Sequence, residues 1–234
     1  MGIRNKRPDL NGTLNIDKPL GWSSAKVCNV VRRLSGGAKV GHAGTLDPLA
    51  TGVLVVCLGK ATKQISGFME AGKEYRAEVD LSAFSTTDDA EGERTIVEVA
   101  SVPTRDAIDR VLREQFLGEI EQAPPRYSAV KIDGQRAYKM ARAGEDFKTR
   151  SKVVRIDSIE IDAYTWPALT LTIACGKGTY IRSIARDLGS ALGTGGMLTG
   201  LVRTRVGAFE LSTARSVEDL PQDPSAWSAD LLGA

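Results

Sequence analysis

The stretch GHAGTLDPLATG, residues 41–52, holds three glycines, the only histidine of the chain and an Asp-Pro pair, and it runs directly into VLVVCL, residues 53–58. This apolar run is short and rich in β-branched side chains, which predicts a buried strand. Pro48 disfavours the α region at Asp47, and the glycines permit backbone conformations that other residues avoid. We therefore expect residues 41–52 to be an irregular loop that fixes the Asp47 carboxylate beside a core strand.

A glycine-rich loop with one aspartate also has the composition of an ordinary turn, because both residue types favour turns for local reasons. A single histidine is likewise more often a hydrogen-bonded structural residue. The string from Gly41 to Leu54, however, closely resembles the catalytic motif of the TruB family of tRNA pseudouridine synthases. By this resemblance Asp47 is the catalytic carboxylate, and His42 enters the RNA where the target base is flipped out.

Two further stretches resemble the same family. KEYRA, residues 73–77, matches the strand that carries the active-site tyrosine, and CGKGTYIRSIARDLG, residues 175–189, matches the arginine motif. The resemblance implies a catalytic site of Asp47, Tyr75 and Arg182. The substrate and RNA-binding residues that we expect with it are His42, Tyr180, Leu201, Lys18, Lys148, Arg150 and Lys152.

Arg182 lies near the start of a predicted helix, where the helix dipole slightly disfavours a cation. It therefore needs a specific partner, and we expect Arg182 to pair with Asp47, because an unpaired buried charge is costly. Two positions depart from the family pattern. Gly195-Gly196-Met197 stands where the family usually has Gly-Ala-His, and Val202 stands where arginine is common.

The bulk composition sets limits on the fold and on the kind of site. A chain of 234 residues, 42% hydrophobic, suffices for one sizeable core with a small appendage. A net charge of +2 does not by itself indicate a nucleic-acid-binding protein. The three separated cysteines predict buried reduced thiols, and a single histidine argues against a zinc site. With no signal peptide or apolar run of membrane length, we expect a cytoplasmic protein without membrane contact.

The order of predicted elements indicates the α+β class, with a mixed, largely antiparallel sheet flanked by helices and loops. Strands are expected at 13–17, 53–58, 73–81, 95–99, 129–132, 153–163, 168–175 and 198–211. Helices are expected after Ser23 or Ser24, around 65–69, after Thr104, at 135–143, from Thr179, and as one turn at 217–220. The family resemblance implies the pseudouridine synthase version of this architecture.

For domain organisation, we expect a flexible basic arm at 1–11 and a single catalytic domain at 12–216. Residues 124–152 differ in texture and are expected to be an inserted, basic, RNA-gripping segment. Its lysines and arginines fit either a solvated loop or RNA phosphate contacts. Residues 217–234 are expected to be a short, weakly ordered tail, too short for the C-terminal RNA-binding domain of the PUA type that bacterial members usually carry.

The resemblance implies that uridine is converted to pseudouridine in the T-arm loop of tRNA, at position 55, by a monomer that needs no cofactor, metal or protein partner. Attack at C1′, addition to the base and removal of a 2′ proton all remain open as the role of Asp47. A nucleoside hydrolase is the rival enzyme, but it usually needs two carboxylates. Its candidates, Asp88 and Asp89, lie in a polar loop where no rigid frame is expected. An RNA-binding module without catalysis is the other rival, and it would need the basic segment but not Asp47.

Overall fold

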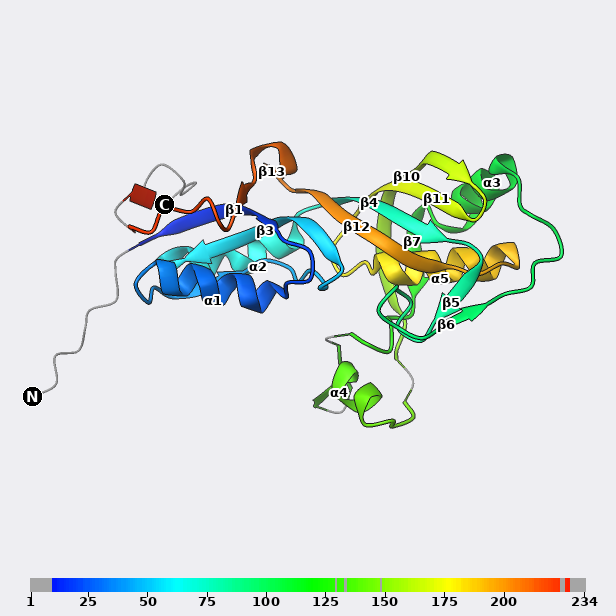
Figure 1. The fold of residues 1–234 in the computed structure, drawn as a ribbon, viewed down its shortest axis with the longest axis horizontal. Coiled ribbons are helices and arrows are strands. Elements are labelled where there is room, and N and C mark those ends of the chain that lie inside the picture. Colours follow the sequence, from blue (N-terminus) through cyan, green and yellow to red (C-terminus); the bar gives the residue numbers. More distant parts are fainter. Residues whose placement is uncertain (1–9, 129, 133, 148, 224–225, 228–234) are drawn as a thin grey trace, which may run out of the picture. The chain divides into compact units, whose positions relative to one another are not determined.

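The computed structural model describes residues 10–128, 130–132, 134–147, 149–223 and 226–227 (Figure 1). Residues 1–9 of the expected N-terminal arm, Lys148, and residues 224–225 and 228–234 of the expected tail lie outside these residues. The chain divides into two compact units. Unit 1 comprises Met1–Lys73 and Val202–Ala234, and unit 2 comprises Glu74–Leu201.

Unit 1 combines two α-helices with strands in the order β14-β1-β3-β12, and β2 and β13 pair with β3 and β12. The β1–β3 pair is antiparallel, whereas β1 and β14 are parallel. Its elements are β1 (Gly12–Lys18), α1 (Ser24–Leu34), β2 (Val40–His42), β3 (Ala50–Leu58), the 3₁₀ helix η1 (Gly59–Gln64), α2 (Ile65–Glu70), β13 (Phe209–Glu210), the 3₁₀ helix η2 (Leu211–Thr213) and β14 (Arg215–Ser216).

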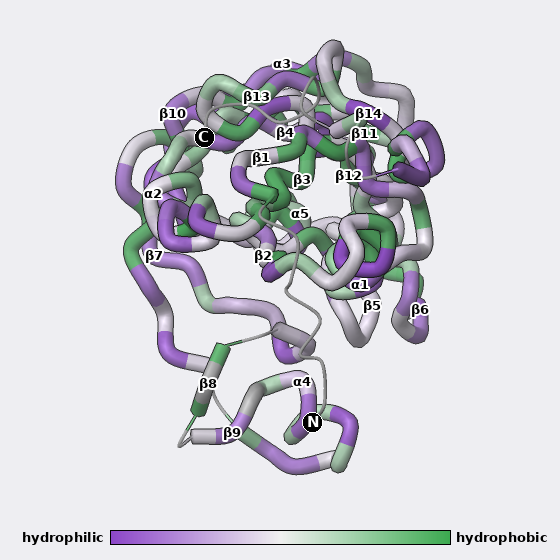
Figure 2. Tube along the Cα trace, turned by 90° about the vertical axis from the view of Figure 1, so that its left-hand side faces the viewer, coloured by the Kyte–Doolittle hydropathy of each residue, from purple (hydrophilic) through white to green (hydrophobic). Residues whose placement is uncertain are grey.

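The core of unit 1 is built around β3. Every side chain from Val53 to Leu58 is buried, and Figure 2 shows the hydrophobic colouring of this strand. Alternate residues of β3 pack with Ala43 and Val206, and Ile65 and Phe68 cover that cluster. Burying one valine or leucine side chain contributes about 1.5–3 kcal/mol. The loop before β3 is thus joined to the most securely packed strand of the unit.

Unit 2 has strands in the order β12-β4-β11-β10-β7, and β10 pairs antiparallel with both neighbours. Strand β12 contributes residues to both units. The elements are β4 (Lys73–Asp80), β5 (Ala83–Ser85), β6 (Arg94–Ile96), α3 (Arg105–Gln115), β7 (Gly118–Gln122), β8 (Lys131–Ile132), β9 (Gln135–Arg136), α4 (Ala137–Arg142), β10 (Lys152–Thr165), β11 (Ala168–Cys175), α5 (Ile181–Leu192) and β12 (Met197–Val206).

These elements confirm the α+β class with a mixed, mostly antiparallel sheet, and the described residues contain five α-helices. Two predicted helix starts are confirmed at the level of single hydrogen bonds. The Ser23 hydroxyl accepts from the Lys26 amide at 3.1 Å, and the Thr104 hydroxyl accepts from the Ala107 amide at 3.2 Å. Each side chain thereby satisfies one of the free amides at a helix N-terminus.

Several local predictions were wrong. Residues 41–52 were expected to be an irregular loop throughout, but residues 41–42 belong to β2, which pairs antiparallel with the end of β3, and residues 50–52 belong to β3. Strand β6 is shorter than expected and exposed, since it pairs only with the short β5. Strand β7 was not predicted, and it pairs with the start of β10.

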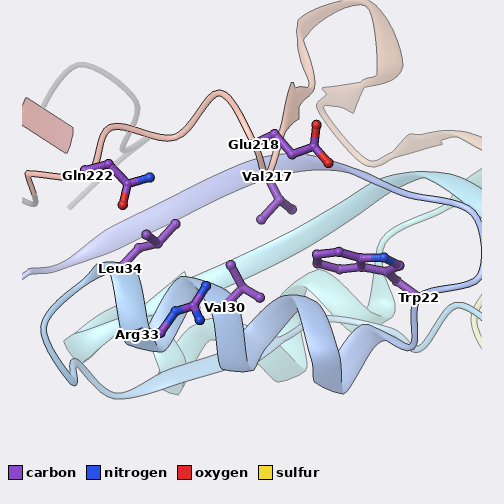
Figure 3. A pocket seen from close by; sticks show the side chains of 7 residues that line it. All are labelled: Trp22, Val30, Arg33, Leu34, Val217, Glu218 and Gln222. Atoms are coloured by element: carbon purple, nitrogen blue, oxygen red, sulfur yellow. The ribbon is translucent and has the colours of Figure 1, made fainter.

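The segment after β14 also differs from the prediction. Residues 217–220 form no helical turn, and Val217 and Leu220 are nevertheless buried. Trp227 is buried too, and its indole N–H donates to the Pro221 carbonyl. A hollow of about 420 Å³ is lined by Val217, Glu218 and Gln222 of this segment and by residues of α1 (Figure 3). The described part of the tail therefore packs on unit 1, and no predicted site residue lines this hollow.

The described residues also bear on the predictions about membrane contact, metal binding and cysteine thiols. No helix in the described part of the chain is both long and apolar enough to span a membrane. The same residues contain no cluster of His, Cys, Asp or Glu suited to a metal ion. Cys28, Cys57 and Cys175 are buried reduced thiols, as predicted, and burial raises the pKa of the Cys28 and Cys57 thiols to about 11.

Candidate active site

The loop between β2 and β3 carries Asp47, which is half-buried. Gly44 and Gly52 have φ values of +93° and +94°, in the region that favours glycine. A Cβ atom on Gly52 would lie 2.3 Å from the Arg203 carbonyl oxygen, so this position admits no other residue without a shift of the backbone. The glycines of the motif thus allow the loop and the first residues of β3 to pass closely against β12.

Side chains from other elements hold both ends of this loop. The Asp17 carboxylate accepts a hydrogen bond from the Gly52 amide at 3.0 Å. Arg203, which is buried on β12, donates from Nε to the Val53 carbonyl at 2.7 Å and from Nη2 to the Gly44 carbonyl at 3.2 Å. Arg203 therefore ties the start of the loop to the start of the core strand, a role that the sequence analysis missed.

Lys18 lies inside unit 1 rather than on its surface. Its side chain is fully buried, and Nζ donates to the Trp22 carbonyl at 2.6 Å and to the Pro19 carbonyl at 2.9 Å. A longer contact of 3.4 Å reaches the carbonyl of Pro48, the residue after Asp47. The ammonium group therefore braces the N-terminal turn against the loop, and an RNA-binding role for Lys18 stays a prediction.

His42 ends β2, and its Nδ1 atom is buried with no hydrogen-bond partner among the described residues. Burial lowers the pKa of His42, the nearby Arg203 guanidinium lowers it further, and a hydrogen bond with the Gly44 backbone opposes both effects only in part. The imidazole is therefore neutral at pH 7.

Because His42 is the only histidine of the chain, its titration can be followed directly by NMR. We expect its ring protons to titrate with a midpoint below 6.5 in the folded protein and near 6.5 in urea. The unfolded chain then binds the proton more tightly, so stability is full above pH 6.5 and falls as the pH drops below that value. A folded-state midpoint at or above 6.5 would contradict the burial of this ring.

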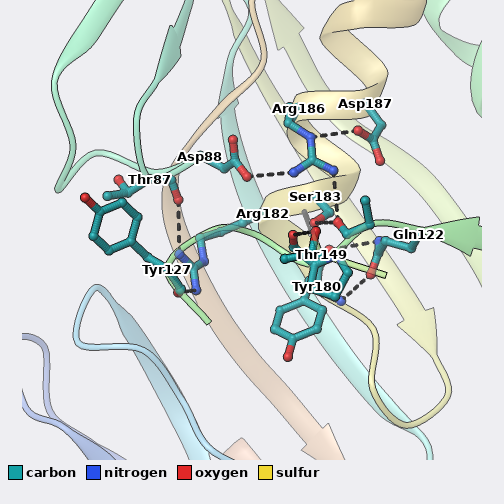
Figure 4. A network of polar contacts seen from close by, with 12 residues as sticks. Thr87, Asp88, Gln122, Tyr127, Thr149, Tyr180, Arg182, Ser183, Arg186 and Asp187 are labelled. Atoms are coloured by element: carbon teal, nitrogen blue, oxygen red, sulfur yellow. Dashed lines mark hydrogen bonds and ion pairs between the residues drawn. The ribbon is translucent and has the colours of Figure 1, made fainter. Parts of the chain in front are cut away.

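In unit 2, Arg182 lies in the first turn of α5, where its guanidinium is enclosed by acceptors (Figure 4). Nη1 donates to the Thr87 carbonyl and Nη2 donates to the Tyr127 carbonyl, each at 3.0 Å. Nη1 also lies 3.2 Å from the Asp89 carboxylate, and the two side chains are only 6% and 2% exposed. The expected pair of Arg182 with Asp47 joins residues of different units and stays a prediction.

The loop of residues 85–93 has a rigid frame, contrary to the expectation from its composition. Asp89 accepts from the Thr87 hydroxyl and from the Glu91 amide in addition to its ion pair. Asp88 has a φ of +60° and pairs with Arg186 of α5 at 2.8 Å (Figure 4). Burial raises the pKa of Asp88, and Arg186 lowers it only in part. Both carboxylates are therefore committed to arginines of α5.

The start of α5 is fixed by the end of β7. The Gln122 side chain accepts from the Tyr180 amide at 2.7 Å and donates to the Tyr180 carbonyl at 3.1 Å (Figure 4). The Ser183 hydroxyl donates to the Ala123 carbonyl at 2.8 Å. This clamp sets the backbone on both sides of Arg182, and the sequence offered no signal for it, since β7 itself was not predicted.

Unit 2 also contains four further predicted site residues, Tyr75, Leu201, Arg150 and Lys152. Tyr75 on β4 and Leu201 on β12 are buried on neighbouring strands of the sheet. Arg150 is exposed on the segment that leads into β10, and Lys152 is exposed as the first residue of that strand.

Unit 1 thus brings together His42, Asp47 and Lys18. Unit 2 brings Tyr180 and Arg182 together at the start of α5.

Comparison with known proteins shows which family models and relatives this chain matches. A family model described as the N-terminal domain of the TruB family pseudouridylate synthases matches residues 32–181. A second, described as the tRNA pseudouridylate synthase B C-terminal domain, matches residues 182–230. A protein of Phocaeicola vulgatus named tRNA pseudouridine synthase B is 47% identical over 89% of this chain and 91% of its own length. A protein of the same name from an Arthrobacter species is 44% identical over 92% of this chain and 72% of its own length.

Solved structures agree with this match. A chain in a Cbf5-Nop10-Gar1 complex is 33% identical, with a TM-score of 0.71. The match covers 94% of the present chain and 56% of that chain. A chain of an H/ACA RNP bound to a substrate RNA containing 2′-deoxyuridine is 30% identical with a TM-score of 0.68. The present chain spans just over half the length of these two structural relatives. Since one family model matches more than half of the chain and close relatives align over most of it, the chain belongs to the TruB family of pseudouridylate synthases.

Proposed function

We propose that this protein isomerises uridine to pseudouridine in tRNA and that its target is the uridine at position 55 of the T-arm loop. The observation that carries the proposal is the 47% identity, over nearly the full length of both chains, to a tRNA pseudouridine synthase B. The anchored loop that carries Asp47 supports it, because a cofactor-free isomerisation at a sugar carbon needs one carboxylate held in place.

The proposed reaction balances within one nucleotide. The bond between C1′ and N1 of uracil breaks, the base turns, a bond between C1′ and C5 forms, and the C5 proton leaves while N1 regains one. No atom is lost and no electron is transferred, so the chemistry calls for no cofactor. The main competing loss is attack of water on C1′, which an enclosed apolar site suppresses.

We assign roles to the candidate residues on this basis. Asp47 acts beside the ribose, by attack at C1′, addition to the base or removal of a 2′ proton. Arg182 pairs with it, since an opposite charge favours the ionised carboxylate. Tyr75 stacks on the uracil and Leu201 closes the pocket. Their burial on neighbouring strands supports an apolar wall of this kind.

The target uridine must leave its stack to reach such a pocket. We assign the vacated position in the RNA to His42, which ends β2 five positions before Asp47. A neutral imidazole ring is suited to this place, because it resembles an uncharged base more closely than a charged imidazolium ring would. Tyr180 contacts the RNA beside Arg182. The protein is proposed to act as a cytoplasmic monomer on the T-arm, which it reads largely by shape.

The test is a tritium-release assay on an unmodified tRNA transcript labelled at uridine C5, with digestion of the product. Pseudouridine and released tritium are expected, and a matched transcript with cytidine at position 55 should release none. Equal release from both transcripts would overturn the assigned position. Free uracil in place of pseudouridine would identify a nucleoside hydrolase, and binding without either product would leave an RNA-binding module.

The basic segment is expected to supply electrostatic affinity for RNA. Replacing Arg150 and Lys152 by glutamine should reduce the slope of log Kd against log salt by about 1–2, because each lost phosphate contact releases roughly one counterion fewer. Filter binding at several salt concentrations measures this slope. Arg113, an exposed arginine paired with Asp109 on α3, offers the control for loss of surface charge. An unchanged slope in the double variant would make the segment ordinary surface.

A further inference from the structure

We propose that Ser24 is a positioning residue for Asp47, acting through the backbone of Leu46. The proposal rests on the proposed function of the Asp47 loop. Its basis is a pair of hydrogen bonds between one buried hydroxyl and the residue directly before the catalytic aspartate.

Ser24 is the first residue of α1 and is 2% exposed. Its Oγ accepts from the Leu46 amide at 2.9 Å and donates to the Leu46 carbonyl at 3.1 Å. Leu46 is itself buried, so water does not replace these bonds. One side chain therefore satisfies both backbone polar groups of a loop residue that has no strand partner. An unsatisfied buried backbone group is costly, which makes this arrangement hard to leave.

The residue after Asp47 is held as well. The Pro48 carbonyl accepts from the Gly21 amide at 2.8 Å, in addition to the longer contact from Lys18. The Asp47 carbonyl accepts from the Ala50 amide at 3.1 Å. Asp47 thus lies between two backbone anchors, both supplied by residues 18–24. Ser24 provides the anchor on the N-terminal side.

This placement has a catalytic consequence. A displacement of about 1 Å at a reacting group can cost roughly a hundredfold in rate, even when the change lies outside the chemistry. Without the Ser24 hydroxyl, the Leu46 peptide groups must turn to find other partners, and the Asp47 backbone turns with them. The RNA-binding surface is not altered by this change. The loss should therefore appear in kcat rather than in KM.

The neighbouring Ser23 provides a matched control. It is exposed, and its hydroxyl accepts from the Lys26 amide, which caps α1; among the residues that the structure describes, no hydrogen bond is recorded from this hydroxyl to the loop. Ser23→Ala and Ser24→Ala each remove one oxygen atom from adjacent positions at the start of the same helix. A general weakening of α1 would affect both variants alike, whereas loss of the loop anchor affects only the second.

The experiment measures kcat and KM for pseudouridine formation at a temperature where all variants are folded, as judged by circular dichroism. Ser24→Ala is expected to lower kcat by roughly 10- to 100-fold with KM within about twofold of wild type. Ser23→Ala should keep the wild-type kcat and show only a lower melting temperature. Ser24→Thr retains the hydroxyl and should recover most of the rate.

Amide hydrogen exchange gives a readout that does not depend on activity. The Leu46 amide should exchange faster in Ser24→Ala than in wild type, and the Lys26 amide should exchange faster in Ser23→Ala. Each variant should leave the other amide unchanged. This crossed pattern locates the lost hydrogen bond directly.

Three results would overturn the proposal: a wild-type kcat in Ser24→Ala despite faster Leu46 exchange, an unchanged Leu46 exchange rate, or a Ser24→Thr variant as slow as Ser24→Ala. Failure of the proposed function is recognised separately, since the wild-type protein itself would then form no pseudouridine. In that case the exchange pattern would still report the anchor, but Ser24 would have no catalytic role.

Discussion

Asp47→Asn is expected to lower kcat for pseudouridine formation by roughly a thousandfold or more, as removal of a central catalytic group does in other enzymes. Asparagine is nearly isosteric with aspartate but carries no negative charge. The loop should keep its shape in this variant, because its anchors reach Gly44, Leu46, Pro48 and Gly52 rather than the carboxylate. The loss should therefore be one of chemistry and not of folding.

Single-turnover tritium release with enzyme in excess over tRNA measures this effect, and filter binding measures the affinity for tRNA in parallel. The Kd should stay within about twofold of wild type, since one substitution at the reacting centre removes little of the phosphate contact that dominates affinity. Asp109→Asn, the same chemical change at an exposed position of α3, is the control and should behave as wild type. Turnover by Asp47→Asn at the wild-type rate would remove Asp47 as the catalytic group.

The sequence predicted best those features that depend on local pattern. Ser23 and Thr104 cap the helices that follow them, because a cap is decided within four residues. The run at 53–58 is a core strand, because six consecutive apolar residues have few alternatives. The short β2 was missed, since three residues carry no periodicity and their regularity comes from pairing with β3.

The supports of the candidate site were harder to predict, because they join residues far apart in the chain. Asp89 and Arg182 are 93 positions apart, and Arg203 lies 150 positions from the carbonyl of Val53 that it binds. No local pattern indicates such partners. The composition of residues 85–93 wrongly predicted a loop without a rigid frame, since serine, threonine, aspartate and glycine are typical of solvated loops. Family resemblance indicated candidate residues for the reaction but not what holds them.

Asp89→Ala is expected to lower the free energy of unfolding by about 3–5 kcal/mol, the usual cost of breaking a buried ion pair by removing one partner. Arg182 cannot lose its proton, so its charge would remain buried, at 6% side-chain exposure, without the Asp89 carboxylate. Domains of ordinary stability have about 5–15 kcal/mol in total. The substitution therefore removes a large share of the stability and displaces the first turn of α5.

Urea unfolding followed by circular dichroism measures this loss. Asp109→Ala is the matched control, because it breaks an exposed ion pair with Arg113 on α3 and should cost less than about 1 kcal/mol. A similarly small loss in Asp89→Ala would mean that the Asp89 carboxylate contributes little to the burial of Arg182.

The double variant Asp89→Leu with Arg182→Met separates stability from activity. Removing both charges leaves no unpaired ion at this buried position of unit 2, so the double variant should be more stable than Asp89→Ala. Pseudouridine formation should nevertheless stay lost, because the proposed partner of Asp47 is gone. Recovery of activity together with stability would show that Arg182 serves only the fold of unit 2. Stability without activity would instead place Arg182 in the reaction, with Asp89 as the residue that allows its charge to be buried there.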